Sequence, residues 1–124
     1  MPANLVVLRS CLVNIIPESS CLELFNNVAR SVRAGGIFIV ETFRPDIITT
    51  DFCFENEFQT VRFIPLPDGR FYSVVEHKAL RIINKEAVRR VGRGDLLRLI
   101  GDQFQIVSED QLTPLTVNTS FKRL

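Results

Sequence analysis

A strand, a helix and a second strand near the start of the chain constrain its fold more than any other feature. Residues 5–8 are apolar on both faces, as is typical of a strand inside a parallel sheet. A helical pattern follows, and Gly35 and Gly36 then precede a second apolar run over residues 37–43. Two strands that are joined through a helix lie parallel, and the crossover is right-handed in nearly all proteins. The sequence therefore predicts a βαβ unit.

The ends and the buried face of the helix are also predicted by the sequence. Ser20 is expected to cap the helix, with Glu23 completing a capping box, and Gly35 and Gly36 are expected to end it. Apolar side chains recur at intervals of three and four residues, which predicts one face packed on a sheet. The residues expected on that face are Leu22, Phe25, Val28, Ala29 and Val32.

The rest of the chain predicts antiparallel strands and one short helix. Residues 44–57 interrupt the pattern and indicate a loop or a short helix. Alternating polarity over residues 58–66 and 70–84, around a turn at 67–69, predicts a long inserted hairpin. Asp95 is expected to cap a helix over residues 96–102, and residues 104–107 and 117–123 are expected to be the last two strands.

Composition indicates a single globular domain and excludes several functional classes. Hydrophobic residues make up 46% of the chain and charged residues 23%, so a packed core is expected within one domain over residues 1–124. The net charge of +1 does not favour nucleic-acid binding. No apolar run approaches the roughly 20 residues that span a bilayer, so we expect no membrane association and a cytoplasmic protein.

The three cysteines, Cys11, Cys21 and Cys53, show no metal-binding spacing. Their odd number and the absence of partnered histidines argue against a disulfide framework and against a zinc site. We expect reduced thiols, each behaving as a small buried hydrophobic side chain, and no metal.

The order of these elements resembles the second half of class I S-adenosylmethionine-dependent methyltransferases. The resemblance lies in the stretch NLVVLRSCLVNIIPESSCLELFNNVARSVRAGGIFIVETF, and above all in VRAGGIFIVE, in GDLLRLIGDQ with FQIVSED, and in the terminal SFKRL. It implies an α/β fold: a Rossmann-like partial sheet with parallel strands from one βαβ unit, an inserted β-hairpin at 58–84 and a C-terminal antiparallel strand pair. The inserted hairpin matches a variable region in which many members of the family contact substrate.

The chain departs from the family pattern where the cofactor binds. In the family, a glycine-rich loop after the first strand approaches the methionine part of the cofactor, and an acidic residue holds the ribose. None of the six glycines forms such a loop, and Asn4 stands where the family has an aspartate. We therefore expect the isolated chain to bind no S-adenosylmethionine and to be inactive alone. The alternatives are a fragment, an enzyme completed by a second chain, and a fold that has lost catalysis.

The resemblance nominates residues at the carboxyl ends of the two parallel strands, where ligands bind in open α/β sheets. Arg9, Ser10 and Cys11 match a cofactor-binding segment, and Glu41 and Phe43 match a segment that borders the substrate. Each has a structural alternative: a solvated charge for Arg9, an ion pair for Glu41 and a core position for Phe43. His77, the only histidine, and Glu41 are the weak catalytic candidates, although His77 lies within an alternating strand.

An unpaired sheet edge at residues 5–8 suggests a partner. If the family arrangement holds, this strand would pair with one that the chain does not contain, and exposed apolar edges are seldom left open. We expect a homo-oligomer, for example a dimer, or a complementary half-chain at Leu5, Val6 and Val7. Two functions follow: the substrate-side half of a methyltransferase that acts on a small molecule, or a non-catalytic interaction module.

Overall fold

The computed structural model of the chain describes residues 3–124, which form two compact units. The larger unit contains the chain up to Arg44 together with Val91–Leu124, and the smaller unit is Pro45–Arg90. Each unit is described by itself below. The expectation of one domain over the whole chain stays a prediction.

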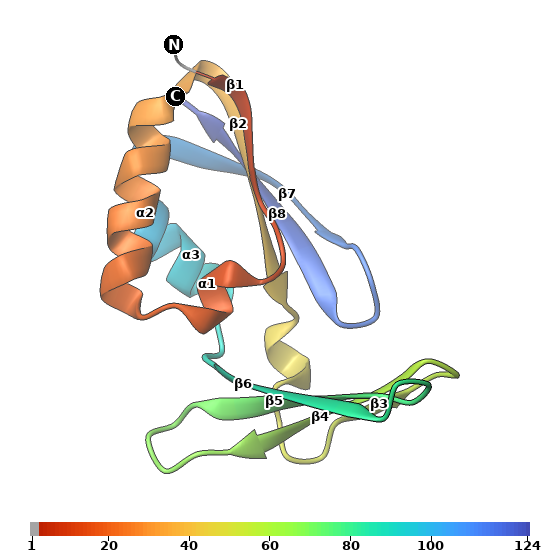
Figure 1. Cartoon of the computed structure of the whole chain (residues 1–124). Helices are drawn as coiled ribbons and strands as arrows, with labels where there is room; N and C mark the ends of the chain where they lie inside the picture. The colour runs from red at the N-terminus through yellow and green to blue at the C-terminus, as the bar shows by residue number, and fades with distance from the viewer. Residues whose placement is uncertain (1–2) are drawn as a thin grey trace. The chain divides into compact units, whose positions relative to one another are not determined.

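A mixed four-stranded sheet is the centre of the larger unit (Figure 1). Its strands lie in the order β1-β2-β8-β7, and β1 is parallel to β2 while the other pairs are antiparallel. This arrangement confirms the parallel βαβ unit and the C-terminal antiparallel pair. The strands are β1 (Ala3–Leu8), β2 (Val32–Phe43), β7 (Phe104–Gln111) and β8 (Thr116–Arg123).

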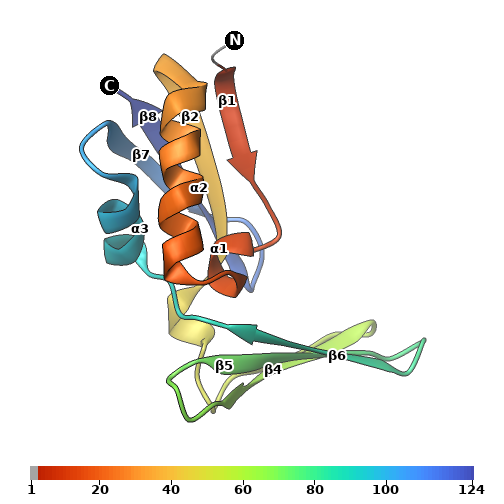
Figure 2. The same ribbon diagram turned by 60° about the vertical axis from the view of Figure 1, so that its left-hand side comes forward.

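Three helices cover one face of this sheet, as Figures 1 and 2 show from two directions. They are α1 (Leu12–Ile15), α2 (Glu18–Ser31) and α3 (Arg93–Ile100). Phe38 of β2 lies at the centre of the core, with its ring centroid 5.4 Å from Phe25 of α2, 6.1 Å from Phe104 and 6.3 Å from Phe121. Each such aromatic pair adds about 0.5–1.5 kcal/mol beyond the burial of area. Phe38 therefore joins α2 to three strands of the sheet.

Helix α2 begins at Glu18, three residues earlier than the sequence predicts. Pro17 is its N-cap, the Cys21 N–H donates to the Pro17 carbonyl at 3.0 Å, and no side chain caps the helix. Ser20 therefore lies inside the first turn, and the predicted capping box with Glu23 is wrong. The predicted buried face is largely confirmed, since Phe25, Val28 and Val32 are buried, but Leu22 is 45% exposed and Cys21 is fully buried instead.

The sequence predicted that the two glycines after α2 end the helix, and this prediction is wrong. The helix ends at Ser31, and β2 begins at Val32 with an extended backbone. Gly35 has a φ of +80°, and Gly36 is buried where the start of β2 approaches β1. A Cβ atom at Gly36 would lie 2.9 Å from the Arg33 carbonyl oxygen and 3.1 Å from that of Asn4. Gly36 thus permits the parallel pairing of β1 and β2.

We predict opposite effects for two glycine-to-alanine substitutions. Gly36→Ala should lower the free energy of unfolding by about 1–3 kcal/mol, because the added methyl group overpacks against two backbone carbonyls. Gly94→Ala in α3 should be neutral or raise it by up to about 1 kcal/mol, because no atom lies within 4 Å of the added group and alanine favours the helix. Urea denaturation followed by circular dichroism measures both. Equal effects would contradict the close approach at Gly36.

The smaller unit is a four-stranded antiparallel sheet in the order β3-β4-β5-β6. It follows a short helix, η1 (Pro45–Ile47), and its strands are β3 (Cys53–Glu55), β4 (Gln59–Pro65), β5 (Phe71–His77) and β6 (Ile82–Val88). The side chains that form its small core are fully or almost fully buried; they are Ile47, Ile48, Val61, Phe63 and Val88. Residues 44–57, predicted as a loop or a short helix, contain η1 and also the strand β3, which the sequence analysis did not predict.

The predicted inserted hairpin is only partly correct. Strands β4 and β5 form it around the predicted turn, but its second arm ends at His77, and a turn at 78–81 leads into the separate strand β6. That turn contains no glycine or proline, and Arg81 has a φ of +53°. Because Lys78, Ala79, Leu80 and Arg81 include none of the residues typical of turns, the sequence does not reveal it.

Helix α3 begins at Arg93 rather than at residue 96. Gly92 is its N-cap, and the Asp95 carboxylate accepts a hydrogen bond from the Gly92 N–H at 2.8 Å. Asp95 is therefore the third residue of α3, where it stabilises the first turn. It is not the N-cap, as the sequence had predicted it to be. None of the helices within residues 3–124 has the length and apolar character needed to cross a membrane.

Candidate functional site

The larger unit has a hollow of about 400 Å³ on its sheet. Residues at the carboxyl end of β1 and near that of β2 contribute to it, which is the edge where the sequence predicts a site. Its lining consists of Leu5, Val7, Arg9, Ile39, Glu41, Leu112 and Asn118. The structure thus brings two of the predicted residues, Arg9 and Glu41, into one cavity.

Strand register explains why these side chains share the hollow. Val7 pairs with Ile39 on β2, and Glu41 pairs with Asn118 on β8. Directly paired residues project to the same face of a sheet, and successive residues alternate. Phe38 and Val40 project into the core beneath the helices, so the alternate residues Ile39 and Glu41 project away from it. The sequence analysis missed Leu112, which lies in the connection between β7 and β8, and Asn118, which the register of β8 places beside Glu41.

Glu41 holds the turn that follows β1. Ser10 and Cys11 adopt left-handed backbone conformations, with φ values of 62° and 54°. Such conformations cost on the order of 1–3 kcal/mol each for residues other than glycine. The Ser10 N–H donates to Glu41 Oε1 at 2.6 Å, a charge-assisted bond that offsets part of this cost. One carboxylate oxygen of the catalytic candidate Glu41 is therefore engaged by the backbone.

Cys11 is 4% exposed and does not line the hollow. Burial, together with a smaller effect of the nearby negative charge of Glu41, raises the pKa of its thiol from 9.0 to about 12. The thiol therefore stays protonated at neutral pH and is a poor nucleophile. Of the three predicted cofactor-binding residues, only Arg9 borders the cavity.

A buried asparagine that sequence analysis did not nominate connects α1 to the end of β2. Asn14 is fully buried, and its Oδ1 accepts a hydrogen bond from the Phe43 N–H at 3.1 Å. Phe43 itself is half-buried and lies outside the lining of the hollow. The available signal was a single polar residue within the apolar run LVNII at 12–16.

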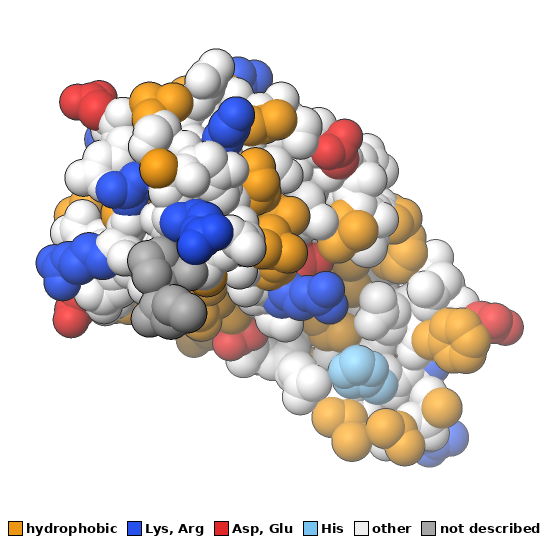
Figure 3. All heavy atoms as spheres, turned by 90° about the horizontal axis from the view of Figure 1, so that it is seen from above, with side chains coloured by type: hydrophobic (Ala, Val, Ile, Leu, Met, Phe, Trp, Pro, Cys, Tyr) orange, Lys and Arg blue, Asp and Glu red, His pale blue; other side chains and the backbone are white. Residues whose placement is uncertain are grey.

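His77 belongs to the smaller unit, whereas Glu41 belongs to the larger one. It is the last residue of β5, and its Nε2 lies 3.3 Å from Asn84 Nδ2 of β6. Figure 3 shows the single histidine of the chain at the surface, with hydrophobic side chains beside it. The catalytic, cofactor and substrate roles of all these residues stay predictions.

The cysteines differ in exposure, which corrects the expectation that all three are buried. Cys11 and Cys21 are buried, but Cys53 is exposed, and all three are free thiols. Cys53 lies on β3, a strand only three residues long at the edge of the sheet. One side of β3 therefore has no neighbouring strand. Among residues 3–124 there is no group of three or more His, Cys, Asp or Glu side chains that is arranged to hold a metal ion.

The raised pKa of Cys11 predicts a loss of stability at alkaline pH. The thiol ionises near pH 9 in the unfolded chain but only near pH 12 in the folded one. Its contribution to folding is therefore complete below about pH 9 and is lost as the pH rises toward 12. The free energy of unfolding should fall more steeply over this range in the native sequence than in Cys11→Ala. Parallel slopes in urea titrations at several pH values would contradict the assignment.

Comparison with known proteins gives a result at the level of fold. The sequence matches no protein-family model and no curated protein. A methyltransferase from Clostridium acetobutylicum that depends on S-adenosylmethionine is 14% identical, with a TM-score of 0.69. An amino pentose methyltransferase from Micromonospora echinaspora, involved in calicheamicin biosynthesis and solved with bound S-adenosylmethionine, is 11% identical, with a TM-score of 0.70. A methyltransferase from Streptomyces caelestis is 8% identical, with a TM-score of 0.68.

The chain is similar in structure to part of the class I S-adenosylmethionine-dependent methyltransferases. The three alignments cover 98–99% of this chain but only 58–61% of the other chains. At these sequence identities the similarity concerns the fold alone. The remaining two-fifths or so of each of those chains has no counterpart in this one.

The described residues do not by themselves fit S-adenosylmethionine. Of the three residues that the resemblance nominates for the cofactor, Cys11 is buried and the Ser10 N–H is already bonded to Glu41. Apart from Arg9, Glu41 and Asn118, the lining of the hollow is apolar. We therefore derive no catalytic step through this cofactor from the residues of this chain.

Proposed function

We propose that the chain is the substrate-side part of an S-adenosylmethionine-dependent methyltransferase and is active only when a complementary segment completes it. The observation that carries this proposal is the fold match over nearly all of this chain and over about three-fifths of the methyltransferases. Small-molecule methyl acceptors are the class we propose, because one of these matching structures acts on an amino pentose.

The open edge of β1 supports completion by a further segment. Strand β1 ends the sheet order, so one side of its backbone has no neighbouring strand among the described residues. Leu5 is 55% exposed and Val7 is 37% exposed. A strand added at this edge would cover these side chains and would bring new residues to the rim of the hollow.

Methyl transfer from a sulfonium depends mainly on the alignment of donor and acceptor. In the completed protein, Arg9 and Glu41 would border the bound molecules from one side of the cleft. The hydrogen bond from Ser10 to Glu41 would keep the turn after β1 in place, so that Arg9 stays at the rim. The complementary segment would supply the main cofactor contacts.

Calorimetric titration with S-adenosylmethionine tests this proposal. The purified chain alone should give no binding heat, and the chain together with a segment that co-purifies with it should give a saturable one. In that complex, Arg9→Gln should weaken binding by about tenfold, as expected for the loss of a charged contact, whereas Arg33→Gln on the exposed start of β2 should not. No heat in either sample would contradict the completed enzyme.

The exposed edge also supports a second function, a non-catalytic module that pairs with a second copy of itself. An antiparallel pairing of two β1 strands centred on Val6 would place Leu5 of one copy opposite Val7 of the other. Each copy would then contribute the same apolar residues, as a two-fold interface requires. Such pairing would remove the open edge without any cofactor.

Sedimentation velocity tests the pairing at β1. At high micromolar concentration the native chain should sediment as a dimer, and Val7→Lys should shift it to a monomer, because a charge at a strand edge opposes pairing. Leu22→Lys, which changes an exposed apolar residue on α2 in the same way, should leave the dimer intact. A native chain that remains strictly monomeric would rule out self-association through this edge.

A further inference from the structure

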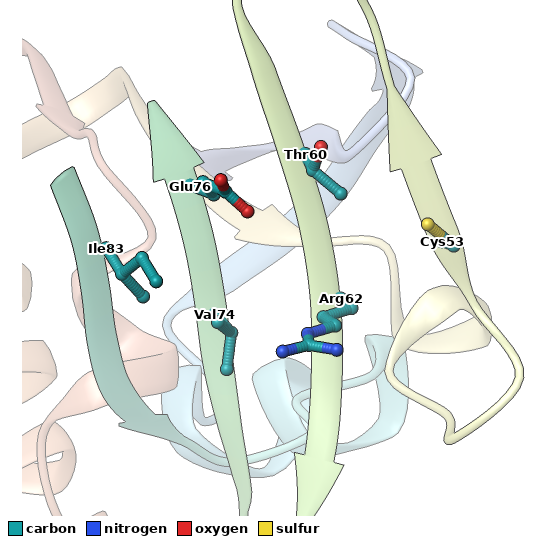
Figure 4. Close-up of a pocket in the computed structure, with 6 residues that line it drawn as sticks. All are labelled: Cys53, Thr60, Arg62, Val74, Glu76 and Ile83. Atoms are coloured by element: carbon teal, nitrogen blue, oxygen red, sulfur yellow. The ribbon is translucent and has the colours of Figure 1, made fainter. Parts of the chain in front are cut away.

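The smaller unit has a second cavity, of about 200 Å³, on one face of its antiparallel sheet (Figure 4). It is formed by side chains from all four strands: Cys53, Thr60, Arg62, Val74, Glu76 and Ile83. Val74 is 3% exposed and forms an apolar floor, while Ile83 is 58% exposed and forms an apolar wall. The volume is below the roughly 300–1,000 Å³ that is typical of pockets for drug-sized ligands. A small metabolite is the size class that fits.

The register of the sheet arranges opposite charges in two neighbouring rows. Arg62 pairs with Val74, and Val74 pairs with Lys85, so this row is basic. Glu76 pairs with Thr60 and with Ile83 in the next row on the same face. Two residues of strand separate the rows, which is a distance of about 7 Å. A guanidinium and a carboxylate thus project over one cavity from adjacent strands.

Neither Arg62 nor Glu76 has an ion pair or a side-chain hydrogen bond with any residue in the range 3–124. Other charges of the same unit do pair: Arg70 lies 2.7 Å from Asp68, and Lys78 lies 2.8 Å from Glu55. Figure 4 shows Arg62 and Glu76 on neighbouring strands, with Val74 and Thr60 beside them. The two charges share the cavity and yet leave their hydrogen-bonding groups available.

We propose that this cavity binds a small zwitterion with an aliphatic body, of the α-amino-acid type. The ligand carboxylate would accept two hydrogen bonds from the Arg62 guanidinium, and its ammonium group would donate to Glu76 and to the Thr60 hydroxyl. The carboxylate and the ammonium group of an amino acid are attached to the same carbon atom, so one small ligand can reach side chains from the two neighbouring rows through charge-assisted bonds of about 2.8 Å each. The hydrocarbon side chain would rest on Val74 against Ile83.

A ligand with both charges fits better than a ligand with one. A simple anion at Arg62 would be repelled by Glu76, and a simple amine at Glu76 would be repelled by Arg62. The zwitterion satisfies both groups at once. This proposal does not depend on methyl transfer or on completion of the larger unit, because every residue it uses lies within the smaller unit.

Titration of the full chain with L-leucine, followed by amide chemical shifts, tests the proposal. Saturable shifts are expected at Thr60, Arg62, Val74 and Glu76. Isocaproate, which lacks the amino group, and isopentylamine, which lacks the carboxylate, should each bind at least about tenfold more weakly, since each loses one charged contact. Alkylation of the exposed Cys53 should slow as leucine fills the cavity.

Matched variants separate this site from a non-specific effect. Arg62→Gln and Glu76→Gln should each weaken leucine binding by about tenfold, and both residues are exposed, so the fold should persist. Arg70→Gln removes an arginine of the same unit that does not line the cavity, and it should bind like the native chain. The proposal is overturned by an absence of saturable shifts, by shifts outside the cavity, by isocaproate binding as tightly as leucine, or by unaltered binding in both pocket variants.

Discussion

The position of β2 between β1 and β8 determines the core of the larger unit, the turn after β1 and the hollow. On its helix-covered face, Phe38 contacts aromatic rings from α2, β7 and β8, which joins α2 to the sheet. On the opposite face, Glu41 lies beside Asn118 and reaches the Ser10 N–H, so the same strand holds the turn after β1. The parallel contact with β1 in turn requires a residue without a side chain at Gly36. A change in the register of β2 would therefore disturb the core, the turn and the hollow together.

The parts of the fold that the sequence predicted are those that depend on periodicity. A buried strand, an amphipathic helix and a second buried strand have distinct patterns, and they specify a parallel pair almost uniquely. The predicted start of α2 was wrong because two nearby residues can each precede a helix. Ser20 is a good capping residue, but Pro17 lies three positions earlier and already fixes the backbone at the start of the helix. The turn at 78–81 was missed because its residues carry no glycine or proline signal, so the strand β6 was merged with β5.

The candidate sites depend on register, which a single sequence does not specify. Arg9 and Glu41 were predicted because both lie near the carboxyl ends of parallel strands, and the topology alone brings such ends together. Asn118 could not be predicted, because its place beside Glu41 is set by how β8 pairs with β2. The same is true of Arg62 and Glu76, which are 14 residues apart and come together only through the pairing of β4 with β5. Cys11 is excluded from the lining of the hollow because it is buried, and no sequence motif predicts that burial.

The two cavities contain similar charged groups in different surroundings. Each is lined by one arginine and one glutamate. In the larger unit, the carboxylate is bonded to a strained turn, and the cavity adjoins an apolar open edge, which favours completion by protein. In the smaller unit, both charges are free of partners within residues 3–124, and the floor between them is apolar. Two unpaired opposite charges over an apolar floor would discriminate between small molecules by charge placement, which an apolar edge cannot do.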